Sequence, residues 1–578
     1  MDAKRVKQSI ILAVSVILVI ILVLVIGKLI DKYTPSKEQQ DLWEYYGLTE
    51  ESQAAIVLNH EVISQKAVIR EGIVYLSYET VRDVFNSRFY WDYNENLLLY
   101  TTPEDVVSAA ADSKEYFVTK DKKSENYTIV YADANTAYIA MDYVKKYTDL
   151  DYEFFEEPNR VVVRTKWEDE PGVFVKKDTQ IRYRGGIKSP ILTEVFKETE
   201  LTVLEKGEDW DKVATNEGVI GYIRKKRLGK EEVKTFEHTP MTETFSHILK
   251  DKKINMAWHQ VTTEDANSTV ADVLSNTKGL NVICPTWFYL NDNEGNLVNI
   301  ASSEYVQYCH NQGVEVWALV SNLENDEVDS AEVLNYTSKR THLVNQLIAA
   351  AIQFDFDGIN VDFEALSQEA GDGYVQFIRE LSLKCENNGI VLSVDNYVPT
   401  EYSMFYNRKE QGNFADYVII MGYDEHYAGG DEGSVASIGF VTQGIADTLK
   451  EVPAEQIILA APLYTRVWIE TPKAASDDVE AASEDYVPYD LSSKAVGMQE
   501  AWRMVEANGV EPVWLEDCGQ YYAEYLNEND TYKIWLEDLA SMELRLQAAS
   551  ENGLAGMAFW KLGFEHSSFW DTVIKYMN

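Results

Sequence analysis

Residues 356–364 read Phe-Asp-Gly-Ile-Asn-Val-Asp-Phe-Glu, and apolar and polar side chains alternate along the second half of this stretch. Alternation with a period of two predicts a β-strand with one apolar and one polar face. The apolar side chains are Ile359, Val361 and Phe363, and the polar ones are Asn360, Asp362 and Glu364. Neighbours on the polar face lie roughly 6 to 7 Å apart, twice the rise per strand residue. A parallel barrel displays reacting groups at such inward positions near the carboxyl end of a strand, whereas the alternative is a half-exposed edge strand.

Strand-like apolar runs alternate with helical patterns from residue 252 onward, which indicates a parallel sheet closed by helices. Besides the stretch quoted above, the runs are residues 254–258, 280–285, 314–319, 390–394, 417–421, 457–461 and 554–560. Eight strands within about 330 residues match a TIM (β/α)8 barrel with moderate insertions. We therefore predict an α/β fold in which this barrel occupies residues 251–578.

The run Asp357-Gly358-x-Asn360-x-Asp362-x-Glu364 resembles the signature of family 18 glycoside hydrolases, DGxDxDxE, with Asn360 in the second acidic slot. Three later segments resemble other motifs of that family. They are residues 421–424, similar to its MxYD motif, residues 461–468, similar to its PFYGR segment with Thr465 in place of Gly, and residues 556–560, where the family has the tryptophan under the bound sugar. The resemblance covers the whole predicted barrel.

The resemblance implies a retaining, substrate-assisted hydrolysis, in which the 2-acetamido group of the sugar takes the place of a carboxylate nucleophile. The implied catalytic residues are Glu364 as acid and base, Asp362 as acceptor for the acetamido N–H, and Tyr423 as the group that holds the acetamido carbonyl. Neither a cofactor nor a metal is implied. The substrate would be a β-linked glycan that contains N-acetylglucosamine.

Further side chains are expected to contact the glycan. An aromatic ring can stack on the apolar face of a pyranose, while carboxylates and amides bond its hydroxyls. The expected substrate-binding residues are Asn360, Asp357, Asp424, Trp560, Tyr464, Arg466, Trp258 and Trp287, and Phe288 and Tyr397 are candidates for the same lining. An aromatic residue taken singly is more often part of a core than of a ligand wall, so their place at strand ends carries this prediction.

Asn360 is the departure from the family pattern. With Asp at this position, two inward carboxylates could share a proton, whereas an amide cannot. We expect Asn360 to donate a hydrogen bond to Asp362, which favours the ionised form of that carboxyl. Because the acid Glu364 is retained, the reaction remains possible with an altered pH profile.

An apolar stretch near the N-terminus predicts a membrane anchor. Residues 10–26 are apolar except for Ser15 and follow Lys4, Arg5 and Lys7, so we assign residues 1–33 to a cytoplasmic tip and a single transmembrane helix. Everything that follows would then lie outside the cell, in the bacterial cell-wall zone. The alternative is a cleaved signal peptide, for which the stretch lacks a small-x-small site.

Between the anchor and the barrel the sequence predicts three segments. Residues 54–166 contain two similar units, each a strand, a short helix and a hairpin, and resemble the copper amine oxidase N-terminal-like domain, here without a histidine cluster for copper. We predict an α+β stalk, with ligand binding as the alternative. Residues 172–229 resemble a bacterial SH3 domain, a small all-β barrel that either binds peptidoglycan or acts as a spacer. Residues 230–250 are charged and polar and are predicted to be a linker.

Composition excludes some functions and leaves others open. The 578 residues carry a formal charge of −43, which disfavours nucleic acid as a partner. The four cysteines lack metal-ligand spacing. Residues 511–539 are predicted to form a hairpin that leads to a helix rather than a large subdomain, a pattern that resembles the spore-cortex and cell-wall N-acetylglucosaminidase branch. We expect a membrane-anchored glycosidase that cuts after N-acetylglucosamine in peptidoglycan or chitin-like glycans, and the alternative is a glycan-binding protein with little or no turnover.

Overall fold

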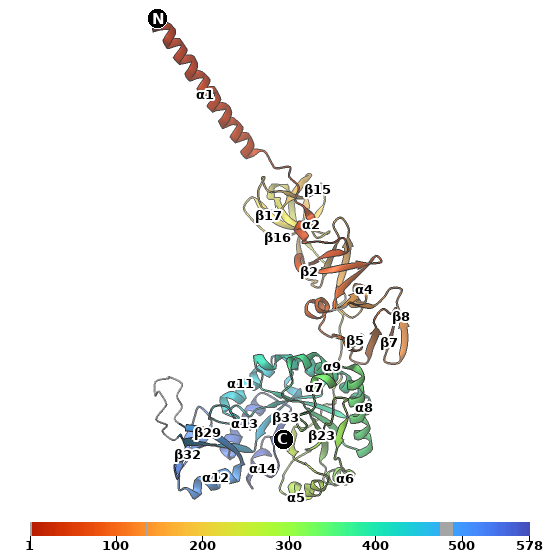
Figure 1. Ribbon diagram of the computed structural model, residues 1–578, viewed down its shortest axis with the longest axis vertical. Coiled ribbons are helices and arrows are strands. Elements are labelled where there is room, and N and C mark those ends of the chain that lie inside the picture. The colour runs from red at the N-terminus through yellow and green to blue at the C-terminus, as the bar shows by residue number, and fades with distance from the viewer. Residues whose placement is uncertain (1–2, 134–135, 474–488, 578) are drawn as a thin grey trace. The chain divides into compact units, whose positions relative to one another are not determined.

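The computed structural model describes residues 3–133, 136–473 and 489–577 (Figure 1). The chain divides into two units. The N-terminal unit comprises Met1–Phe89, Ala109–Phe117 and Lys122–Thr242, and the barrel unit comprises Tyr90–Ser108, Val118–Asp121 and Glu243–Asn578. Each unit is described by itself below.

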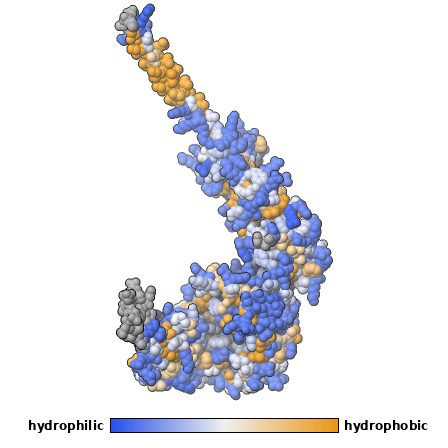
Figure 2. Space-filling view, viewed as in Figure 1, coloured by the Kyte–Doolittle hydropathy of each residue, from blue (hydrophilic) through white to orange (hydrophobic). Residues whose placement is uncertain are grey.

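Helix α1 (Ala3–Tyr33) is long and apolar enough to cross a membrane. The apolar side chains along this helix are exposed, and none of its most apolar stretch is buried. At about 1.5 Å per residue, its 31 residues exceed the ~30 Å hydrocarbon core of a bilayer. Figure 2 shows hydrophobic residues along the middle of this helix and hydrophilic residues near both of its ends. The predicted apolar helix is therefore present, while a signal sequence would meet the same criteria.

The two similar units at residues 54–166 have the predicted order of strand, short helix and hairpin. The first consists of β3 (Ile73–Ser77), α3 (Tyr78–Thr80) with η1 (Val81–Phe85), β4 (Phe89–Asp92) and β5 (Leu97–Thr101). The second consists of β10 (Thr136–Ala140), α4 (Met141–Lys146), β11 (Asp151–Phe155) and β12 (Arg160–Arg164). The two hairpins join different sheets, because β11 and β12 pair in the order β11-β12-β1-β2-β3-β10-β9, whereas β4 and β5 begin the order β4-β5-β6-β7-β8.

The remaining strands of these two sheets are β1 (Gln53–Leu58), β2 (Glu61–Arg70), β6 (Val106–Ala110), β7 (Glu115–Val118), β8 (Asp121–Ser124) and β9 (Val130–Asp133). Strand β1 is central in its sheet, with β12 parallel on one side and β2 antiparallel on the other. Its side chains Ala54, Ala55, Ile56 and Val57 are fully buried. A short helix, α2 (Leu42–Tyr46), precedes it.

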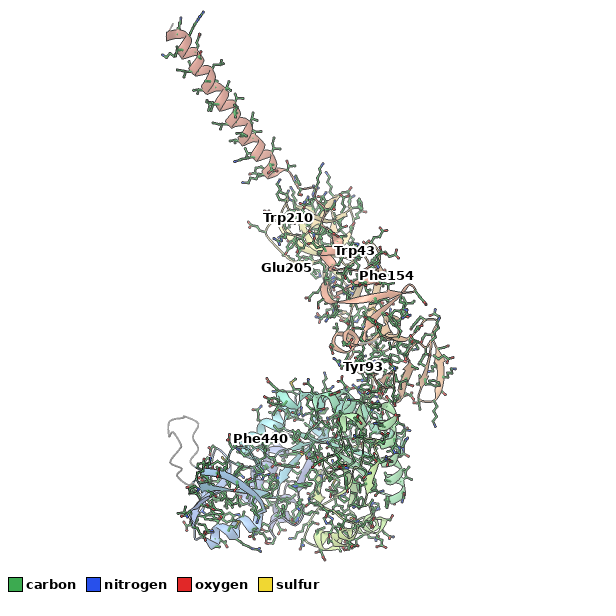
Figure 3. All side chains as sticks on the ribbon, in the orientation of Figure 1. Trp43, Tyr93, Phe154, Glu205, Trp210 and Phe440 are labelled. Atoms are coloured by element: carbon green, nitrogen blue, oxygen red, sulfur yellow. The ribbon has the colours of Figure 1, made fainter. Side chains whose placement is uncertain are left out.

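A separate antiparallel sheet follows, in the order β15-β14-β18-β17-β16-β13-β19. Its strands are β13 (Glu170–Val175), β14 (Thr179–Arg182), β15 (Ile191–Val195), β16 (Glu200–Glu205), β17 (Trp210–Thr215), β18 (Ile220–Arg224) and β19 (Leu228–Lys234). Trp210, labelled in Figure 3, is half-buried, and the Arg224 guanidinium lies 5.6 Å from its ring centre. Residues 230–234 of the predicted linker belong to β19, where they pair with β13.

Eight parallel strands of the described chain close a barrel, as predicted. They are β20 (Ile254–His259), β21 (Val282–Leu290), β23 (Glu315–Ser321), β24 (Gly358–Asp362), β25 (Val391–Tyr397), β26 (Tyr417–Met421), β27 (Ile457–Pro462) and β33 (Gly556–Trp560). Pairing of β20 with both β21 and β33 closes the ring. Short β22 (Leu297–Asn299) pairs antiparallel with β21.

Helices follow the barrel strands along the chain. They are α5 (Val270–Ser275), α6 (Ser303–Asn311), α7 (Ser330–Leu334), α8 (Thr337–Phe354), α9 (Gly371–Asn388), α10 (Arg408–Phe414), α11 (Ile438–Thr448), α13 (Leu539–Glu551) and α14 (Phe569–Val573). Alternate residues of the barrel strands point to opposite faces and pack in two separate hydrophobic cores. Ile359, Val361 and Phe363 pack in the cluster that includes helix residues such as Leu347, whereas residues such as Trp258 and Trp317 pack in a second cluster inside the barrel.

The segment between β27 and β33 forms a small subdomain, which differs from the simple hairpin and helix that the sequence predicted. Its sheet has the order β29-β28-β32-β31-β30, with α12 (Met498–Ala507) beside it. The strands are β28 (Tyr464–Pro472), β29 (Tyr489–Gly497), β30 (Val513–Leu515), β31 (Gln520–Asn527) and β32 (Asp530–Leu536). The predicted hairpin is β31 with β32, and these strands share a hydrophobic cluster with α12.

Residues 90–108 belong to the barrel unit and cover the N-terminal turn of α8. Asp92 Oδ2 accepts hydrogen bonds from the backbone N of Thr337 (2.7 Å) and from its Oγ1 (2.6 Å). The fully buried Arg340 donates to Tyr90 Oη at 3.2 Å. A carboxylate is favourable at the positive end of a helix dipole. The hairpin thus supplies an acceptor for the backbone N–H at the start of α8.

Candidate active site

Strand β24 carries the predicted site residues into the carboxyl-terminal mouth of the barrel. Asn360 is fully buried, Asp362 ends the strand, and Glu364 follows just beyond it. Asn322, just past the end of β23, holds the backbone at Glu364, because its Oδ1 accepts from Glu364 N (2.8 Å) and its Nδ2 donates to Glu364 O (2.9 Å). The alternation read from the sequence therefore places the three polar side chains on the barrel's inner face.

The Glu364 carboxyl has a raised pKa and borders a cavity. Burial raises the pKa of its carboxyl, a hydrogen bond from Tyr397 lowers it, and the charges of Asp424 and Glu324 raise it further, with a net increase. Glu364 lines a cavity of about 260 Å³ between the loops that follow β23 and β24. A carboxyl with a raised pKa that borders open space can keep its proton until a substrate needs it.

Asp362 combines burial with an unused hydrogen-bonding atom. Burial raises the pKa of Asp362 well above its usual value, and the charges of Asp395, Glu364 and Glu324 add to this increase. Its Oδ1 is buried and has no hydrogen-bond partner among the described residues. A buried acceptor without a hydrogen bond raises the free energy of the folded state. A hydrogen-bond donor on a ligand would therefore bind favourably to Asp362 Oδ1.

Asn360 does not donate to Asp362, contrary to the prediction. Its Nδ2 donates to Ser393 Oγ (3.0 Å) and to Asp395 Oδ1 (2.9 Å) on the neighbouring strand β25. Its Oδ1 accepts from Trp258 Nε1 at 3.0 Å. Because an indole N–H can only donate, this bond fixes the orientation of the amide and directs both N–H groups toward β25.

Tyr423, Asp424, Tyr464 and Arg466 lie together at the ends of β26 and β27. Tyr464 Oη donates to Asp424 Oδ1 at 2.5 Å, and Arg466 Nη2 lies 3.8 Å from the same oxygen. The ring of Tyr423 meets that of Tyr464 edge-on, with centroids 6.3 Å apart. Burial and the charge of Asp362 raise the pKa of Tyr423, so its phenol remains a hydrogen-bond donor beside the carboxyls.

Trp258 and Trp560, both predicted to contact the substrate, lie together on the inner face of the barrel. Their ring centroids lie 5.8 Å apart with the planes tilted by 59°. Trp560 is half-buried, whereas Trp258 is only 1% exposed. Trp560 is therefore partly accessible, whereas the burial of Trp258 contradicts its predicted contact with the substrate, and its indole N–H bonds Asn360 instead.

Two predicted substrate contacts lie in the wrong places for that role. Asp357 precedes β24, at the opposite end of the strand, where its Oδ2 accepts from Val316 N (2.8 Å) and meets His310 Nε2 (2.8 Å). Trp287 is fully buried in the layer between strands and helices, and its Nε1 donates to Asn267 Oδ1 at 2.8 Å. Both positions favour a structural role, and Phe288 packs in the same outer layer.

One carboxyl of the site was missed by the sequence analysis. Asp395 on β25 is 2% exposed, and burial raises the pKa of its carboxyl well above the usual value. Ser393, Asp395 and Tyr397 alternate with Val394 and Asn396. That alternation was the available signal, but the predicted strand ended at residue 394, before Asp395, whereas β25 continues to Tyr397.

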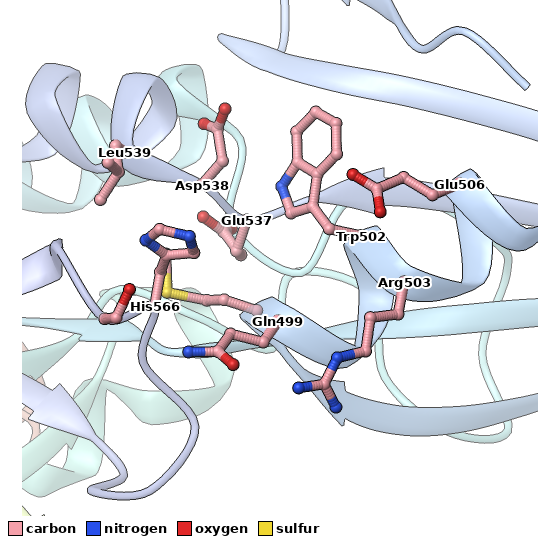
Figure 4. A pocket seen from close by; sticks show the side chains of 10 residues that line it. Gln499, Trp502, Arg503, Glu506, Glu537, Asp538, Leu539 and His566 are labelled. Carbon is pink, nitrogen blue, oxygen red and sulfur yellow. The ribbon is translucent and has the colours of Figure 1, made fainter.

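A second cavity of the barrel unit measures about 420 Å³ and contains no residue of the predicted site. It lies between α12, the start of α13 and the loop after β33, and Figure 4 shows Trp502, Glu537 and His566 around it. Burial raises the pKa of Glu537 to about 7, although its carboxylate is paired with Arg545 at 2.8 Å. In the described ranges, no group of three or more His, Cys, Asp or Glu residues is arranged to hold a metal ion.

Comparison with known proteins identifies the barrel. The model of the glycosyl hydrolases family 18 matches residues 288–565. This chain carries a family 18 glycoside hydrolase domain. The match runs from within β21 to beyond β33 and confirms the family resemblance seen in the barrel, and with it the assignment as a glycoside hydrolase. It does not extend to the segments before the barrel, so their resemblances stay predictions.

Two curated relatives come from Bacillus subtilis. The chain is 24% identical over 333 residues to the "Uncharacterized glycosylase YvbX", which covers 54% of this chain and 91% of that protein. It is 26% identical over 270 residues to the "Cortical fragment-lytic enzyme", covering 45% of this chain and 59% of that protein. The chain therefore spans about three fifths of the length of the second relative.

A solved structure matches the family 18 domain in fold. The crystal structure of the "C-terminal domain of putative chitinase" from Desulfitobacterium hafniense superposes with a TM-score of 0.50 and 16% sequence identity. The superposition covers 57% of this chain and 100% of that domain. At this identity the match supports the barrel fold alone.

Proposed function

We propose that the chain hydrolyses the bond after N-acetylglucosamine in peptidoglycan or a related chitin-like glycan, with retention of configuration and with the substrate's own acetamido group as nucleophile. The observation that carries this proposal is the pair formed by Glu364 and Asp362. Burial raises the pKa of the Glu364 carboxyl, which borders a cavity, while Asp362 presents a buried oxygen without a partner among the described residues.

The first chemical step breaks the glycosidic bond. Glu364 gives its proton to the glycosidic oxygen, and the leaving sugar departs as an alcohol. The acetamido carbonyl oxygen attacks the anomeric carbon and closes an oxazolinium ring. Asp362 accepts the acetamido N–H and stabilises the positive charge that develops there, and Tyr423 donates to the acetamido oxygen and keeps it in line with the anomeric carbon.

The second step uses the same residues in reverse. The Glu364 carboxylate takes a proton from a water molecule, whose oxygen attacks the anomeric carbon and opens the oxazolinium ring. The acetamido group is restored, and Glu364 has regained its proton. Two inversions at one carbon give overall retention, and a single acid serves both steps, which explains why a second nucleophilic carboxylate 5 to 5.5 Å away, as in ordinary retaining enzymes, is not required.

Peptidoglycan is favoured as the polymer by the name of the "Cortical fragment-lytic enzyme" among the relatives. Digestion of purified peptidoglycan, followed by borohydride reduction and analysis of the reduced sugar, tests this. We expect reduced N-acetylglucosamine. Reduced N-acetylmuramic acid would mean that the other bond is cut, and cleavage of chitin oligomers alone would rule out peptidoglycan. Binding of glycan without new reducing ends would favour a glycan-binding protein with little or no turnover.

We further propose that α1 anchors the chain with its N-terminus in the cytoplasm and the family 18 domain outside. Lys4, Arg5 and Lys7 precede the apolar residues, and positively charged flanks favour the cytoplasmic side. Protease added to intact, wall-stripped cells should release the family 18 domain, while a cytoplasmic marker protein stays intact. Complete protection of the domain would reverse the orientation, and a secreted chain with a new N-terminus near residue 33 would indicate a cleaved signal.

A further inference from the structure

The pairing of β24 with β25 places a second carboxyl beside Asp362. The two strands are parallel, with Asn360 opposite Ser393 and Val361 opposite Val394, so the next pair in this register is Asp362 with Asp395. Neighbouring strands lie about 4.8 Å apart, whereas successive residues on one face of a strand lie roughly 6 to 7 Å apart. By these spacings, Asp395 on the neighbouring strand lies closer to Asp362 than Asn360 on the same strand does.

Asn360 cannot supply the missing carboxyl, but it orients the one on β25. Its Nδ2 donates to Asp395 Oδ1 at 2.9 Å, and its amide cannot turn toward Asp362 without losing the bond from Trp258 Nε1. Asp395 is 2% exposed. Two buried carboxylates on neighbouring strands repel each other, and the ordinary outcome is that they bind one proton between them.

We infer that Asp362 and Asp395 share one proton in the free protein, so that Asp395 replaces, from the next strand, the carboxyl that the second acidic slot of β24 lacks. This inference rests on the proposed function for its catalytic meaning. Asp395 is a positioning residue, because it acts through Asp362. When an acetamido N–H donates to Asp362, the ionised form of Asp362 is favoured, and the shared proton moves to a carboxyl oxygen of Asp395. No proton leaves the site, and Asp362 carries the negative charge that faces the oxazolinium ion.

The surroundings of Asp362 and Asp395 raise the pKa of both carboxyls, which favours retention of a proton. Burial raises the pKa of Asp362, and the charges of Asp395, Glu364 and Glu324 raise it further. Burial likewise raises the pKa of Asp395, the bond from Asn360 lowers it, and the charge of Glu364 raises it. The other titratable groups that the two carboxyls influence are neutral thiol and phenol groups from surrounding elements: Cys284 on β21, Tyr374 on α9, Tyr406 at the end of η5 (Glu401–Tyr406) and Tyr423 after β26. The guanidinium of Arg408 acts on Tyr374 and Tyr406.

Infrared spectroscopy tests the shared proton without any substrate. The carbonyl stretch of protonated carboxyls is recorded above neutral pH for the full chain and for Asp362→Asn, Asp395→Asn and the double variant. If one proton is shared, the double variant loses the band area of one carboxyl rather than two, and each single variant loses that area at the pH where its remaining carboxyl ionises. Losses that add in the double variant, or the absence of any loss, would overturn the inference. Asp416→Asn removes a buried carboxyl at the start of β26 and should leave this band in place.

Kinetics then test what the shared proton does. In the wild type, a proton held by Asp395 would let Asp362 stay ionised to low pH, whereas in Asp395→Asn the carboxyl of Asp362 must ionise alone. The acid limb of kcat/KM should therefore move to higher pH in Asp395→Asn, with about a tenfold loss at a fixed acidic pH for each unit of movement. The double variant Asn360→Asp with Asp395→Asn returns the carboxyl to β24 and should move the limb back.

The outcomes separate the inference from the proposed function. A wild-type chain that shows the shared proton but cleaves no N-acetylglucosamine polymer would sink the proposed function and leave the inference standing. A cleaving enzyme in which Asp395→Asn keeps the wild-type acid limb would overturn the catalytic role of Asp395. A folded Asp395→Asn variant whose acid limb moves, but is not moved back in the double variant, would contradict the transfer of the carboxyl between strands.

Discussion

Replacing Glu364 with glutamine should lower kcat on N-acetylglucosamine oligomers by a factor of about 100 to 10,000, the usual contribution of a positioned general acid. Glutamine keeps the size of the side chain and can accept the hydrogen bond from Tyr397, but it cannot deliver a proton to the glycosidic oxygen. KM should change little, because the contacts made before the reaction are retained. Release of reducing ends under saturating oligomer measures the effect.

Glu369→Gln is the matched control for this substitution. Glu369 lies on the next short helix, η4 (Gln368–Ala370), and is exposed, so its replacement should leave kcat within about twofold, as is usual for surface positions. If Glu364→Gln turned over as fast as the parent, Glu364 would not be the acid and the mechanism would be misassigned. An equal loss in both variants would instead point to a general effect on folding.

Local pattern predicted much of the barrel because each strand carries its own signal. Alternation in residues 356–364 separated Val361 from Asp362, and the structure places these two side chains in the outer core and in the inner site respectively. The same alternation, applied to β21, would have placed Trp287 on the outer face with Ile283. Trp287 was assigned to the site because it lies near a strand end. Position along a strand is a weaker criterion than the face of the sheet on which a side chain lies.

Contacts across strands could not be predicted in the same way. The bond from Asn360 to Asp395 depends on the register of β24 against β25, which no local pattern specifies. The subdomain after β27 was not predicted for the same reason, because β28 pairs with β29 and β32, which are separated from it in the sequence. Likewise, nothing in the sequence indicates that the buried Arg340 donates a hydrogen bond to Tyr90.

The requirement for an acetamido group distinguishes this mechanism from that of an ordinary two-carboxylate glycosidase. A thiazoline analogue of the oxazolinium ion should inhibit strongly, because it mimics the species that Asp362 and Tyr423 stabilise. Asp362→Asn should weaken both turnover and inhibition, since a neutral hydrogen bond has about half the strength of a charge-assisted one. Wild-type enzyme and Asp362→Asn are therefore compared with the same inhibitor.

The most direct measurement compares two oligomers that differ only at the 2-position of the sugar at the cleaved bond, one N-acetylated and one with a free amine. Without the acetamido oxygen there is no nucleophile, so the account predicts rapid release of reducing ends from the acetylated oligomer and none above background from the amine. Cleavage of the two oligomers at comparable rates would contradict it, even though the chain would still be a glycosidase.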